Sequence, residues 1–84
     1  MDEKFTVEYQ YQDYLKKVGL KEEDMFPVQK AETKRAFFGG VGHILALMKN
    51  EIANLPEDEE GVQVLESLNN QVLSFFIAEA QSEN

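Results

Sequence analysis

Apolar residues recur at seven-residue intervals along residues 27–54, and this recurrence restricts the possible fold more than any other feature of the chain. One series is Ala31, Phe38, Leu45 and Ile52, and a second is Val41, Met48 and Leu55. Side chains seven positions apart lie on one side of an α-helix, so the pattern predicts a single helix about 42 Å long. Pro27 suits its first position, where the missing N–H would have no partner in any case.

Two further helices are predicted, at about residues 6–18 and 58–81. Gly19 follows the first as a left-handed helix stop, and the acidic run before the second suits the positive end of a helix. The connection between residues 27–54 and 58–81 is short, so these two helices are expected to form an antiparallel hairpin. The sequence therefore predicts an all-α fold in which residues 1–84 form a single helical domain.

The small size of the chain points to self-association. A domain of 84 residues buries only about 60% of its unfolded surface, and a core that small is marginally stable. The chain has no cysteine, which excludes disulfides and thiolate metal sites and suits a reducing compartment. It has neither an apolar run of about 18 residues nor an apolar amino-terminal segment, so we expect a cytoplasmic protein with no membrane partner.

Charge is unevenly distributed and argues against one class of partner. The formal net charge is −8, and residues 55–84 contain seven acids and no base. Proteins that bind duplex nucleic acid present basic patches to the phosphates, so duplex DNA or RNA is not expected as a partner. An acidic helical surface can instead bind a basic protein surface, although its commonest role is solubility.

Three glycines interrupt the long predicted helix directly after a pair of phenylalanines. Glycine in a helix interior costs about 0.5–1 kcal/mol relative to alanine, so Gly39, Gly40 and Gly42 need a reason. Gly39, Gly42 and Ala46 share one flank of the apolar seam, where another helix could approach closely. A helix kink at the glycines or the direct approach of a ligand to the backbone are the alternatives.

A second apolar stripe lies on the helix predicted at residues 58–81, about 120° from its core face. It consists of Val62, Asn69, Leu73, Ile77 and Ala80. A helix that is apolar on two sides usually has two neighbours. The helix at residues 6–18 could cover this stripe, or a second copy of the chain could do so. We take Leu73 and Ile77, with Gly39, Gly42 and Ala46, as the predicted interface of a homo-oligomer.

The residues needed for catalysis are sparse. His43 is the only histidine, and the sequence contains no zinc-protease motif, nucleophile elbow or calcium-binding loop. The acidic runs at residues 22–24 and 57–60 lie in predicted connections, where solvated charge is the simplest interpretation. We therefore predict that the protein is not an enzyme and uses no metal or cofactor.

A small basic cluster gives the most specific binding hypothesis. Lys30, Lys34 and Arg35 lie near the positive amino-terminal end of the long helix and could hold an anion. Tyr11 could stack on a base if the first helix folds over that end. The alternative is ordinary ion pairing of these bases with Glu8, Asp13 or the acids at residues 22–24.

The architecture of residues 30–80 resembles that of small phage-encoded proteins that sequester cyclic oligonucleotide immune signals, the anti-CBASS sponges. The resemblance implies a helical, oligomeric, non-enzymatic protein of the host cytoplasm, with Tyr11, Lys30, Lys34 and Arg35 as candidate ligand-binding residues. Two functions are therefore open. The chain is either a self-associating phage or mobile-element accessory protein that binds and inhibits a protein partner, or a sponge for a cyclic nucleotide or another anionic ligand.

Overall fold

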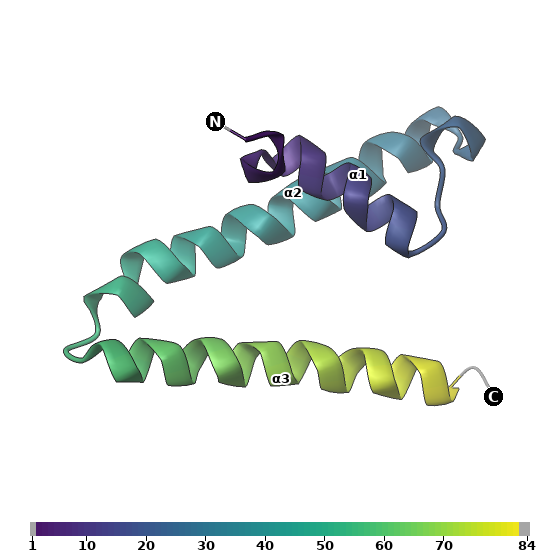
Figure 1. The fold of residues 1–84 in the computed structure, drawn as a ribbon. Helices are drawn as coiled ribbons and strands as arrows, with labels where there is room; N and C mark the ends of the chain where they lie inside the picture. The colour runs from purple at the N-terminus through teal and green to yellow at the C-terminus, as the bar shows by residue number, and fades with distance from the viewer. Residues whose placement is uncertain (1, 83–84) are drawn as a thin grey trace. The chain divides into compact units, whose positions relative to one another are not determined.

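A computed structural model describes residues 2–82, which contain helices and turns and no strand. Figure 1 shows the three α-helices, whose bounds are α1 Val7–Lys17, α2 Pro27–Asn50 and α3 Asp58–Ser82. Short 3-10 turns precede α1 and α2 and follow α2; they are η1 Glu3–Phe5, η2 Glu22–Asp24 and η3 Ile52–Asn54. The predicted all-α fold class, with one short and two long helices, is confirmed.

Local side-chain and backbone interactions define both ends of α1. The Thr6 hydroxyl accepts a hydrogen bond from the Tyr9 backbone N–H at 3.1 Å, which caps the amino terminus. At the other end Gly19 has a φ of +74°, and the Leu20 N–H donates to the Leu15 carbonyl at 2.9 Å. This is the left-handed glycine stop expected from the sequence.

The long helix α2 begins at Pro27 as predicted but ends at Asn50, four residues before the predicted end at Asn54. The side-chain amide of Asn54 donates to the Asn50 carbonyl at 2.8 Å, and Glu51 departs from helical geometry with φ −117° and ψ −57°. Residues 52–54 consequently form the tighter turn η3. The α-helix itself continues through Gly39, Gly40 and Gly42.

The contacts of the chain divide into two compact units, Met1–Ala46 and Leu47–Asn84, with the boundary inside α2. In the first unit α1 packs on α2 and buries Tyr11 and Leu15. In the second unit α3 contacts η3, where a Cβ on Gly61 would lie 3.3 Å from Ile52 Cγ2. Because each unit is described by itself, the antiparallel hairpin and the single domain stay predictions.

Candidate functional site

An aromatic cluster joins α1 to α2 in the first unit. Tyr11 is 0% exposed, and its ring centroid lies 5.4 Å from that of Phe37 and 6.2 Å from that of Phe38. Tyr14 also contacts Phe37, with 5.2 Å between ring centroids. These tilted and edge-on distances are the ones that aromatic pairs prefer. The cluster therefore forms the core of this unit and orients the polar groups around it.

A chain of polar side chains borders the cluster. Lys34 Nζ lies 2.6 Å from Glu8 Oε1, and Gln12 Nε2 donates to Glu8 at 3.1 Å and to Glu22 at 3.0 Å. The hydrogen bond from Lys34, assisted by the one from Gln12, lowers the pKa of Glu8, and the same bond raises the pKa of Lys34. Both side chains therefore carry their charges when the pair is formed.

The ammonium group of Lys34 also lies beside two aromatic rings. Its Nζ atom is 5.8 Å from the ring centroid of Tyr11 and 5.8 Å from that of Phe38. Both distances are within the range of cation–π attraction. Lys34 is thus held by one carboxylate and two rings, all within the first unit.

The hydroxyl of Tyr11 is the one buried polar side-chain atom without a hydrogen-bond partner among residues 2–82. Burial raises the pKa of Tyr11 above its ordinary value of 10.0, and the Glu22 carboxylate raises it further because it disfavours a second negative charge nearby. The phenol is therefore neutral over the physiological range and contributes to packing.

The structure brings together two of the four residues predicted to bind an anion. Tyr11 and Lys34 are in contact, but the ring of Tyr11 is fully buried and the charge of Lys34 is paired with Glu8. Lys30 and Arg35 are exposed and form no ion pair within the described part of the chain. Ion pairing, the alternative left open by the sequence, is confirmed for Lys34.

Another acidic residue considered as a partner for these bases is paired elsewhere. Asp13 Oδ2 lies 2.9 Å from Lys17 Nζ, one turn further along α1.

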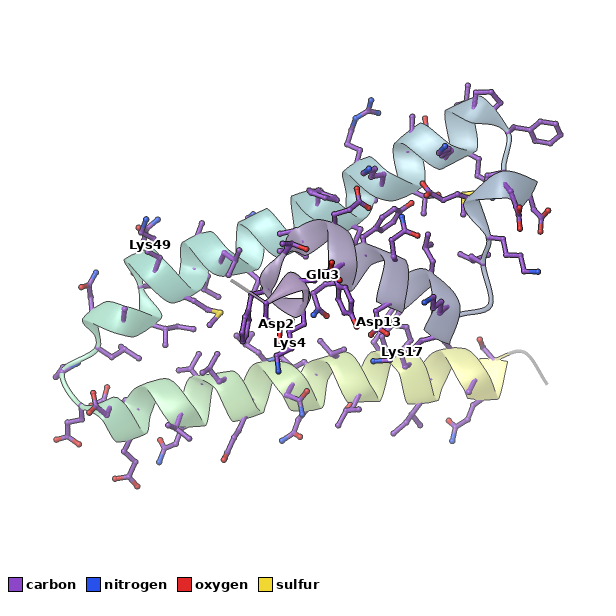
Figure 2. All side chains as sticks on the ribbon, turned by 45° about the horizontal axis from the view of Figure 1, so that its top comes forward. Asp2, Glu3, Lys4, Asp13, Lys17 and Lys49 are labelled. Carbon is purple, nitrogen blue, oxygen red and sulfur yellow. The ribbon has the colours of Figure 1, made fainter. Side chains whose placement is uncertain are left out.

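Figure 2 labels both residues, and it also shows Asp2, Glu3 and Lys4 at the amino-terminal turn. Lys49 is labelled near the carboxyl end of α2, where a positive charge suits the helix dipole. The charges of α1 are therefore largely satisfied within its own unit.

The residues predicted to form an oligomer interface are all exposed. A Cβ built on Gly39 or Gly42 would meet no heavy atom within 4 Å, leaving aside the adjoining residues and the backbone of the helix itself. Ala46 is exposed as well, and Leu73 and Ile77 are 52% and 59% exposed. The space above the glycines is therefore open in the single chain, and what fills it stays a prediction.

The second unit lacks a comparable core. Of its described residues, none on α3 is buried, and the half-buried ones are Glu60, Gly61, Val64 and Leu68. An open groove of about 410 Å³ runs along these residues and includes Leu55 and Gln63 in its lining. Beyond Leu68 every described residue of α3 is exposed.

Large apolar side chains occupy that exposed part of α3. Phe75 and Phe76 are 57% and 54% exposed, and their rings contact each other with centroids 5.2 Å apart. Periodicity gives the side of a helix on which apolar residues lie, but not how far a neighbouring element extends along it. The exposed apolar part of α3 is therefore a candidate interaction surface.

Residues 2–82 contain neither a metal-binding cluster nor a membrane-spanning helix. Among residues 2–82, no group of histidine and acidic side chains is placed to hold a metal ion, and no helix has the length and hydropathy needed to cross a membrane. Comparison with protein-family models, curated proteins and solved structures finds no match to this chain. The exposed surfaces are therefore the features of the chain that bear on its function.

Proposed function

We propose that the protein is a non-enzymatic helical module that associates with copies of itself and binds a protein partner. The observation that carries the proposal is the exposure of α3, where Leu73, Phe75, Phe76 and Ile77 are each more than half exposed. Monomeric proteins rarely leave contiguous apolar patches of more than a few hundred Å² in water, and larger patches mark interaction sites. A helix of this kind gains stability when another polypeptide covers it.

The charge of the chain favours a protein partner over a nucleic acid. The net charge of −8 repels phosphates, whereas acidic residues around an apolar patch provide the polar rim of a protein interface. A phage or mobile-element accessory protein that inhibits a host protein by covering its surface is the form of this function that we propose. Its action would consist of binding and would require no catalytic group.

Native mass spectrometry over a range of protein concentrations tests the self-association. We expect assemblies of defined stoichiometry, with the assembled fraction rising as concentration increases. The circular dichroism signal of the helices should strengthen in parallel, because α3 is stabilised only when it is covered. A fully helical protein that remains monomeric at about 100 µM would contradict the proposal, since the apolar patch would then be stable in water.

Sequestration of an anionic ligand is the alternative function, and the exposed bases Lys30 and Arg35 are the observation that favours it. A cyclic dinucleotide present at about 100 times its dissociation constant should stabilise the fold by about 2.7 kcal/mol. Replacement of Lys30 and Arg35 by alanine should abolish the corresponding rise in melting temperature. A panel of cyclic dinucleotides that leaves the melting temperature unchanged would favour the protein partner.

A further inference from the structure

The part of α2 that follows the aromatic cluster is held by little other than its own backbone. Of residues 39–46, only Val41 is half buried, and the five residues from 42 to 46 are all exposed. Ile44 and Leu45, the two large aliphatic side chains among these five, are 43% and 51% exposed. Residues 39–46 therefore form about two helical turns that packing against the described part of the chain supports only at Val41.

Three glycines weaken the helix within this same stretch. A Cβ added to Gly39, Gly40 or Gly42 would meet no heavy atom within 4 Å, leaving aside the adjoining residues and the backbone of the helix itself. Close packing against another described element therefore does not account for these glycines. Each of them makes the helix easier to unwind, because glycine gains more backbone freedom on leaving a helix than any other residue.

The residues before the glycines are anchored much more firmly. Phe37 and Phe38, directly before them, contact the buried ring of Tyr11. About one turn earlier, Lys34 is paired with Glu8 on α1. After the glycines, the first compact unit ends at the boundary inside α2. The glycines therefore lie between the part of α2 that is fixed to α1 and the end of the first unit.

We propose that residues 39–42 form a hinge in α2, which opens while the aromatic cluster before it stays intact. Paired glycines are a known position for a bend in a helix. Opening breaks the hydrogen bonds that the N–H groups of residues 43–46 donate to the carbonyls of residues 39–42. It exposes no buried side chain, because residues 39–46 contain none. The chain beyond the hinge can then change direction without disturbing the contact between α1 and α2.

The hinge is a property of the single chain and goes beyond the proposed function, so its test uses dilute protein. Hydrogen exchange of the full chain at low micromolar concentration, followed by mass spectrometry of overlapping peptides, measures local opening. After correction for intrinsic rates, the amides of residues 43–46 should exchange at least tenfold faster than those of residues 34–37. Equal protection of the two segments would overturn the hinge.

The triple variant Gly39→Ala, Gly40→Ala and Gly42→Ala separates a hinge from ordinary fraying at the end of α2. Each alanine favours the helix by about two- to fivefold, so the exchange of residues 43–46 should slow by about tenfold or more. Exchange of residues 34–37 should change by less than about twofold, because α1 already protects them. An unchanged rate at residues 43–46 would show that the glycines do not control opening and would overturn the hinge.

Faster exchange in the triple variant, or loss of its helical circular dichroism signal, would also overturn the hinge. Either result would mean that the added Cβ atoms collide with a surface that packs on the glycines.

Gly61→Ala is the matched control, because it makes the same substitution in α3, outside the proposed hinge. It should leave the exchange of residues 43–46 unchanged. If it slows their exchange as much as the triple variant does, the response is a general change in stability, and the hinge is overturned.

Discussion

The two units of this chain use aromatic residues in opposite ways. In the first unit, Tyr11 is completely buried between α1 and α2, in contact with Phe37 and Phe38. In the second, Phe75 and Phe76 contact each other while more than half of each side chain is exposed. Buried rings stabilise the chain that contains them, whereas exposed rings can contribute that energy only when another surface covers them.

This contrast separates the part of the chain that is stabilised by contacts within its own unit from the part that has few such contacts. The first unit has capping hydrogen bonds, a ring cluster and an ion pair, so α1 is held on α2 by contacts within the chain. The second unit has a helix of 25 residues with no buried residue. Isolated helices are marginally stable in water, and most helix stability in proteins comes from packing of an apolar face. We therefore expect the stability of α3, but not that of α1, to depend on protein concentration.

The largest expected effect comes from removing the buried aromatic ring of the first unit. Tyr11→Ala should destabilise the contact between α1 and α2 by about 3–5 kcal/mol, as for other buried aromatic residues, and expose α1 to proteolysis. Urea unfolding followed by circular dichroism measures the loss. Tyr9→Ala is the control, since Tyr9 lies on the same helix and is 45% exposed; it should change stability by about 0.5 kcal/mol or less. Equal effects of the two substitutions would contradict a core centred on Tyr11.

Local signals explain which parts of the fold could be predicted from the sequence. Gly19, Pro27 and the acidic start of α3 each impose a backbone or capping requirement, and the helix bounds near them agree with the prediction. The end of α2 could not be predicted, because it depends on the Asn54 amide taking the Asn50 carbonyl in place of a backbone donor. The periodicity of apolar residues does not distinguish a helix that ends with this side-chain hydrogen bond from one that continues for another turn.

The candidate site was harder to predict than the fold. Periodicity places Tyr11 on the apolar side of α1, but the depth of its burial depends on Phe37 and Phe38, which lie far along the chain. The pairing of Lys34 with Glu8 likewise joins residues 26 positions apart. The sequence gives the charges and leaves open which carboxylate each base meets. Exposure of α3 cannot be derived from its amphipathic pattern, since the same pattern serves a core and an interface.

A charge placed among the exposed apolar residues of α3 should give the second largest effect. Leu73→Glu should weaken self-association at least tenfold, equivalent to about 1.4 kcal/mol, because a carboxylate would have to be desolvated within an apolar interface. Sedimentation equilibrium measures the dissociation constant. Ser74→Glu adds the same charge on the polar side of α3 and should have a smaller effect. If both variants associate equally weakly, the apolar stripe is not the interface and net charge alone controls assembly.

Glycine substitutions should give effects of similar or smaller size, and of opposite sign in different places. Gly40→Ala should raise the stability of α2 by about 0.5–1 kcal/mol, since a Cβ there meets open space. Gly19→Ala should lower stability by about 1–2 kcal/mol because its φ of +74° strains any side chain. Thermal melts of dilute protein compare the two variants. A fall in melting temperature for Gly40→Ala would mean that something already occupies the space above the glycines.

The flank formed by Gly39 and Gly42 can then be tested separately from helix stability. Gly39→Leu should also be accommodated in the single chain, because no heavy atom lies within 4 Å of the new Cβ beyond the helix backbone and adjoining residues. If another helix packs closely there in the assembly, the same substitution should lower the assembled fraction seen by native mass spectrometry. Unchanged assembly would remove this flank from the predicted interface and leave α3 as the surface to be explained.

The smallest effect is expected from the exposed ion pair that borders the buried cluster. The pKa of Glu8 is lowered from its ordinary value of 4.5, mainly by the hydrogen bond from Lys34. A carboxylate with a lowered pKa stabilises the folded state above its ordinary pKa, and this contribution is lost as pH falls through the lowered value. The pKa of Lys34 is raised from 10.5, so its contribution is complete below that value and is lost as pH rises through the raised one.

Lys34→Met should therefore leave the fold intact and flatten the decrease in melting temperature on acidification below about pH 5, because Glu8 would then titrate nearer its ordinary pKa in both states. The change should be small, since exposed ion pairs contribute little to stability and are screened by salt. Lys30→Met is the control, because it removes the same charge from a base that forms no ion pair among residues 2–82. Identical acid profiles for the two variants would show that net charge, and not the contact of Lys34 with Glu8, determines the response of the first unit to pH.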